Sequence, residues 1–158
     1  MNLFTHSEKR IIMKDAKFMT ADEKEKVLKQ WIRFIRNGFQ LHDFTDKLYK
    51  HLSLHCSFIA HYNLQGFYHT YFEQPETTAQ FLTQFDRNHG YRSVEYGGYS
   101  WINDAEYSDL NQAMCDAIES VKSRIYDECK LRERIGDLRI AKALLSKHGI
   151  NMEEAVHE

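Results

Sequence analysis

The sequence predicts an all-α fold, an irregular bundle of five or six helices with a small β-hairpin insertion near residues 91–102. Three observations support this class. Apolar residues recur every three or four positions through most of the chain, which is the helical period. One proline and seven glycines in 158 residues are too few for a turn-rich β fold. A hydrophobic share of 42% supplies a packed core and excludes a disordered chain.

The chain length predicts a single domain. Residues 1–18 show no sustained period and are expected to form a flexible N-terminal arm, so that residues 19–158 form one helical domain. No apolar run is long enough for a membrane span, and the N-terminus lacks the apolar core of a secretory signal. A net charge of −2 gives no global field for nucleic acid. We therefore expect neither a membrane nor a nucleic-acid partner from composition.

The cysteines indicate the compartment. Cys56, Cys115 and Cys129 are an odd number, with neither a C-x-x-C pair nor a zinc-site spacing. Free thiols are typical of proteins in a reducing environment. The expected location is cytoplasmic.

Two helices are expected in the first part of the domain. Thr20 with Glu23 forms a capping-box pattern before an apolar stripe of helical period, and Gly38 is a typical helix stop. A second stripe follows Asp43, which is the predicted N-cap of a helix reaching about residue 61.

The middle of the chain is rich in aromatic residues. Residues 66–75 form either a short buried helix or an extended segment, because periodicity does not separate the two for a short apolar run. Pro75 is expected to open a helix that ends near Asn88–Gly90. In residues 91–102, two runs rich in tyrosine flank Gly97-Gly98, which is the observation that predicts the hairpin.

The C-terminal part carries a long apolar stripe that starts near Asn103 and continues past residue 140. This part forms either one long helix or two helices. In the second case the helices cover residues 104–129 and 131–148. We expect two, with the break between residues 128 and 137, because Gly136 costs about 1 kcal/mol relative to alanine inside a helix. A stripe this long also suggests the seam of a homodimer.

No complete catalytic motif is present, so the sequence identifies no enzymatic activity. The leading functional hypothesis is binding of a protein partner or a small ligand by the region rich in aromatic residues and histidine. Tyrosine and tryptophan combine a large apolar surface with a polar group, which suits a ligand site. The expected ligand-binding residues are Tyr62, Tyr68, Tyr71, Tyr96 and Trp101.

A second hypothesis is a metal-binding protein or a metal-dependent enzyme. His51 and His55 are four residues apart, so a helix presents both imidazoles on one face. The third ligand is expected to be His69 or a carboxylate from another segment, and zinc or iron is the candidate metal. The glutamate of an H-E-x-x-H motif is absent, since Leu52 follows His51.

A third hypothesis is nucleic-acid binding by the basic segment from Lys130 to Lys147, which has six basic and two acidic side chains. We favour a solvated charged face for this segment, because the whole chain is acidic and lacks a helix-turn-helix pattern.

The last 24 residues carry one local resemblance. Ile135-Gly136, Ala143-Leu144 and the ending Asn151-Met152-Glu153-Glu154-Ala155-Val156 are similar to a ubiquitin-associated three-helix module. The resemblance implies a loop at Gly136 between two short helices. This chain lacks the aromatic residue that such modules carry after the glycine, and we carry over no function.

Overall fold

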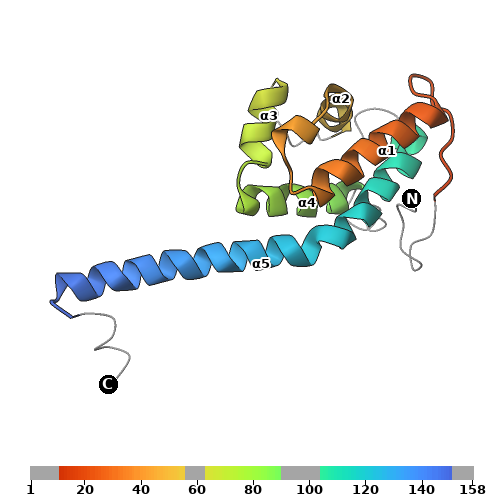
Figure 1. The fold of residues 1–158 in the computed structure, drawn as a ribbon. Helices are drawn as coiled ribbons and strands as arrows, with labels where there is room; N and C mark the ends of the chain where they lie inside the picture. The colour runs from red at the N-terminus through yellow and green to blue at the C-terminus, as the bar shows by residue number, and fades with distance from the viewer. Residues whose placement is uncertain (1–10, 56–62, 90–103, 151–158) are drawn as a thin grey trace.

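The computed structural model describes residues 11–55, 63–89 and 104–150. Within these ranges it contains helices and no strand, so the predicted all-α class is confirmed (Figure 1). The predicted hairpin at residues 91–102 lies outside the described residues, as do residues 1–10 of the predicted arm. The helices are α1 (Ala21–Arg36), α2 (Asp46–His55), α3 (Leu64–Tyr71), α4 (Pro75–His89) and α5 (Ser108–Lys147), with 3-10 turns at Leu41–Asp43 and Asp104–Glu106.

Helix α1 begins and ends where the sequence predicts. The Glu23 amide donates to the Thr20 hydroxyl at 3.2 Å, and the Thr20 amide donates to the Glu23 carboxylate at 3.3 Å, which completes the capping box. After the helix, Gly38 takes a positive φ of 86°, a conformation that glycine adopts without steric cost. The buried face of α1 is fixed to α5, because the Trp31 indole donates to the Met114 carbonyl at 3.0 Å.

Helix α2 starts later than expected, because Asp43 does not cap it. The Asp43 carboxylate is buried and turns back to α1, where it accepts from the Asn37 amide and pairs with Arg33, each at 3.2 Å. The Thr45 hydroxyl instead accepts from the Leu48 amide at the first turn of α2. The first described range ends at His55, so the predicted continuation of this helix to residue 61 lies outside the described residues.

Helices α3 and α4 enclose the aromatic part of the core. The aromatic-rich segment is a helix and not a strand, because the Asn63 side chain caps it by accepting from the Gly66 amide at 2.7 Å. Pro75 opens α4, as predicted. The rings of Phe72 and Phe81 are 4.8 Å apart, in an edge-to-face arrangement that stabilises the α3–α4 corner.

Helix α5 is one continuous helix of 40 residues, so the expectation of two helices split between residues 128 and 137 is wrong. Gly136 lies inside it, and a Cβ added there would have no neighbouring heavy atom within 4 Å. A penalty of about 1 kcal/mol for one glycine does not end a helix when neither proline nor a competing contact is present. The loop implied by the resemblance to a ubiquitin-associated module is therefore absent.

The two parts of α5 have different surroundings. Up to Ile125, the helix contributes a buried stripe to the core and packs against both α1 and α4. The side chain of Cys129 still packs on the core, and beyond it the helix runs out of the bundle, as the blue end of the ribbon in Figure 1 shows. We call residues 126–147 the α5 extension. At 1.5 Å per residue it is about 33 Å long. No helix in the described ranges has the length and the apolar character needed to cross a membrane.

Candidate functional site

Helix α2 brings His51 and His55 together, as their spacing predicts, with ring centroids 4.5 Å apart. Both side chains are buried, and His55 also packs on the Tyr107 ring at 4.7 Å. The Nε2 atom of His51 lies 2.7 Å from Oδ1 of Asn111 on α5. Burial, followed by the neighbouring His55, lowers the pKa of His51 from 6.5 to about 3. This imidazole is therefore neutral at physiological pH.

A neutral buried imidazole is suited to hold a metal, but the third predicted ligand lies elsewhere. His69 is half exposed on α3, where its Nδ1 lies 3.2 Å from the Glu73 carboxylate. Among the described residues, no group of three or more histidine, cysteine, aspartate or glutamate side chains is arranged to hold a metal ion. The structure therefore unites two of the three predicted ligands.

A buried lysine next to this cluster was not anticipated from the sequence. Lys24 is fully buried, and its ammonium group lies 2.8 Å from the Asp109 carboxylate and donates to the Glu106 carbonyl. Burial tends to raise the pKa of Asp109, but hydrogen bonds from Lys24, Lys14 and Leu110 hold it below 3.8. The signal was available, because Lys24 precedes Val27 and Leu28 by three and four residues on the apolar face of α1.

Two of the predicted ligand-binding tyrosines lie in the described residues, and both contact the core. The Tyr68 hydroxyl donates to the Phe39 carbonyl at 2.7 Å, and burial raises the pKa of Tyr68. The Tyr71 ring is 5.6 Å from that of Phe81. Both tyrosines thus pack partly on core side chains, and Tyr71 also lines a cavity with Thr77 and Gln80. The other predicted residues, Tyr62, Tyr96 and Trp101, lie outside the described residues.

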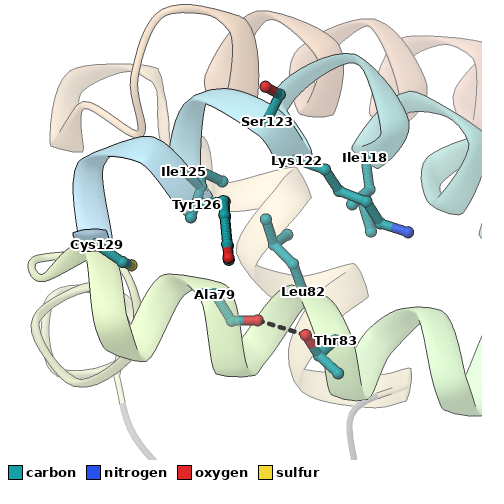
Figure 2. A pocket seen from close by; sticks show the side chains of 9 residues that line it. All are labelled: Ala79, Leu82, Thr83, Ile118, Lys122, Ser123, Ile125, Tyr126 and Cys129. Carbon is teal, nitrogen blue, oxygen red and sulfur yellow. Dashed lines mark hydrogen bonds between the residues drawn. The ribbon is translucent and has the colours of Figure 1, made fainter. Parts of the chain in front are cut away.

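An apolar groove of about 500 Å³ runs between α4 and α5. Figure 2 shows Leu82 pointing from α4 toward α5, with Tyr126 extending from α5 toward α4. The ammonium group of Lys122 is already paired with Glu119. The groove thus offers apolar contact and little free charge. Its lining residues are Ala79, Leu82, Thr83, Ile118, Lys122, Ser123, Ile125, Tyr126 and Cys129.

The α5 extension begins within this groove, at Tyr126 and Cys129, and exposes large apolar side chains farther along. Leu138 is 49% exposed and Ile140 is 61% exposed, although both residue types are usually buried. Five large aliphatic side chains are exposed along the extension, namely Leu131, Ile135, Leu138, Ile140 and Leu144. In the described part of the chain, only one ion pair joins the extension to another helix, Arg132 with Glu76 of α4 at 3.0 Å.

Three of these side chains form a regular line together with Leu145, which is half-buried. Leu131, Ile135, Leu138 and Leu145 follow one another at intervals of four, three and seven residues, which places them on one side of the helix. We call these four residues the leucine stripe. The stripe is rotated by roughly 100° around the helix axis from the buried stripe that ends at Ile125. It is therefore not a continuation of the face that packs on the body.

The composition of the extension separates it from the rest of the molecule. Between Lys130 and Lys147 it has six basic and two acidic side chains, whereas the whole chain has a net charge of −2. An exposed helix that combines an apolar line with positive charge is typical of a binding surface. No protein-family model, no curated protein and no solved structure matches this chain.

Proposed function

We propose that this chain is a protein-binding module, in which the helical body anchors the α5 extension and the extension binds another protein. The observation that carries the proposal is the exposure of Leu131, Ile135 and Leu138, at 41% to 57%, on a helix that has left its own core. Contiguous exposed apolar side chains of this kind mark interaction sites. Free thiols at Cys115 and Cys129 fit the cytoplasmic location expected from the cysteine pattern.

The construction of α5 supports this role. An isolated helix is costly to start in water, because its first turn fixes several residues for a single hydrogen bond. Here the body supplies a preformed helix up to Ile125, so the extension only propagates it. The body thereby presents an ordered helical surface, and a partner that binds it does not bear the cost of folding it.

The proposal replaces the aromatic region as the primary binding surface. Tyr68 and Tyr71 pack on the core, whereas α5 carries more than half of the exposed large apolar side chains in the described ranges. The groove between α4 and α5 leads into the extension through Tyr126 and Cys129. At 100° per residue these two residues lie roughly on the opposite side of α5 from Leu131, Ile135 and Leu138, so the groove and the leucine stripe are separate surfaces.

The test separates binding from folding. Replacing Leu131, Leu138 and Leu144 together with glutamine should change the free energy of unfolding by less than about 1 kcal/mol, because exposed substitutions have small effects. A photo-cross-linking amino acid in place of Ala141, beside the stripe, should form a discrete protein adduct in cells, and the triple variant should lose it. The matched control places the cross-linker at Phe18, which is 78% exposed outside the extension.

Two results would contradict the proposal. Equal adduct yields from positions 18 and 141 would show that the extension has no special affinity for proteins. A destabilisation of more than about 2 kcal/mol in the triple variant would show that the leucines pack against the body in solution.

A further inference from the structure

The leucine stripe has the spacing of a two-stranded coiled-coil seam. Leu131, Leu138 and Leu145 occupy one core position of successive heptads, and Ile135 occupies the other. Lys142 occupies the second core position of the next heptad, between Leu138 and Leu145. Since a charged residue inside a seam specifies its partner at a cost in stability, Lys142 requires an acidic group opposite it.

Three of the five residues beside the stripe are arginines, and the other two, Ala141 and Ser146, carry no charge. Arg132, Arg134 and Arg139 lie at the positions that flank a coiled-coil core, whereas Glu133 and Asp137 lie on positions turned away from it. Arg132 pairs with Glu76 of α4. Within the described ranges, Arg134 and Arg139 have no carboxylate at ion-pair distance and are exposed. The flanks thus offer two guanidinium groups to a partner.

These charges disfavour a second copy of this chain as the partner. A parallel pair places Arg134 opposite Arg139 of the other copy, and Lys142 opposite itself. An antiparallel pair places Arg132 opposite Arg139 of the other copy. Either arrangement brings like charges together across the seam, which is a common way to exclude a wrong partner.

The apolar side chains of the stripe also disfavour nucleic acid as its partner. A nucleic-acid backbone would neutralise the arginines but would leave Leu131, Ile135 and Leu138 with no apolar surface to contact. A partner helix with both apolar and acidic side chains can contact the leucines and pair with the arginines at the same time.

We infer that the occupant of the leucine stripe is an acidic amphipathic helix of another protein. Its apolar residues contact Ile135 and Leu138, and its glutamates or aspartates pair with Arg134, Arg139 and Lys142. This inference rests on the proposed function and specifies the chemistry of the partner.

The experiment uses the full chain and two designed 21-residue peptides, each a heptad helix with leucine at its core positions. One peptide has glutamate at the flanking positions and the other has lysine. In fluorescence anisotropy, the acidic peptide should bind at least about tenfold more tightly than the basic one, and its affinity should fall as salt rises. Arg134→Glu/Arg139→Glu should reverse this preference. Ile135→Asn/Leu138→Asn should abolish binding of both peptides.

The alternative outcomes separate the two claims. A chain that sediments as a dimer, and returns to a monomer in Ile135→Asn/Leu138→Asn, overturns the acidic-partner inference and leaves protein binding by the extension intact. Binding of duplex DNA that depends on Arg134 and Arg139, but is unchanged in Ile135→Asn/Leu138→Asn, overturns both. Equal affinity for the two peptides, or no binding of either, overturns the inference alone.

Discussion

Residues 108–125 of α5 and the α5 extension belong to one unbroken helix, yet their aliphatic side chains have opposite surroundings. Leu110 and Ile118 are fully buried against α1 and α4, whereas Leu138 and Ile140 are 49% and 61% exposed. The same residue type therefore contributes to folding in the first part and is available for binding in the second. Position relative to the body, and not composition, decides the role of each leucine.

The largest expected difference between the two parts comes from one matched substitution. Leu110→Ala should lower the free energy of unfolding by about 3 kcal/mol, because it removes buried methyl groups and leaves a cavity. Leu138→Ala should change it by less than about 0.5 kcal/mol, because that side chain is exposed and alanine is the better helix former. Urea denaturation of both variants makes the measurement. Similar losses in the two variants would show that the extension packs on the body.

The change in the free energy of unfolding with pH should be smaller than the loss caused by Leu110→Ala. It should originate in His51, which lies in the body. The pKa of His51 is about 3 in the folded chain and 6.5 without the surrounding structure. Between these values the unfolded chain binds a proton that the folded chain does not, so the free energy of unfolding decreases as pH falls. From pH 7 to pH 5 this contribution is about 2 kcal/mol.

Denaturation across this pH range should show a flatter slope in His51→Gln than in the parent chain. His69→Gln, in which the replaced side chain is half exposed, serves as the matched control and should retain the parent slope. If the free energy of unfolding of His51→Gln changed with pH as steeply as that of the parent chain, another group would be responsible for the pH dependence.

The smallest expected effect concerns the extension alone. Gly136→Ala should stabilise the local helix by about 1 kcal/mol, because alanine has the higher helix propensity and its Cβ meets no neighbour. Amide hydrogen exchange in residues 131–147 should slow about fivefold, while exchange in α1 and the melting temperature stay unchanged. A rise in the melting temperature of the body would mean that the two parts of α5 unfold as one unit.

Local signals predicted much of the body. The Thr20–Glu23 capping box and Pro75 at the start of α4 act within a few residues, so the sequence alone reveals them. Asp43 was assigned wrongly because its buried pairing with Arg33 depends on the tertiary fold. A cap pattern shows which side chain is able to cap a helix, and the fold determines which one does.

The candidate site was less predictable. The sequence directed attention to the aromatic residues, since exposure cannot be read from composition, and Tyr68 and Tyr71 contact the core. One signal for the extension was present. Cys129 and Leu131 are two residues apart, which breaks the three-to-four spacing and moves the apolar line to another side of the helix. Such a change of phase in a long stripe indicates that its two parts face different surroundings.

The continuity of α5 also fixes geometry between the body and whatever binds the extension. A helix without proline or a competing turn is a stiff spacer, and α5 spans about 60 Å in all. A flexible linker would allow a bound protein to take many positions relative to the body. This helix instead holds the bound protein at a fixed distance from the body and in a fixed orientation. Inserting one residue after Ile125 would turn the leucine stripe by about 100°, and four residues would nearly restore its direction. The helix thus determines orientation as well as contact.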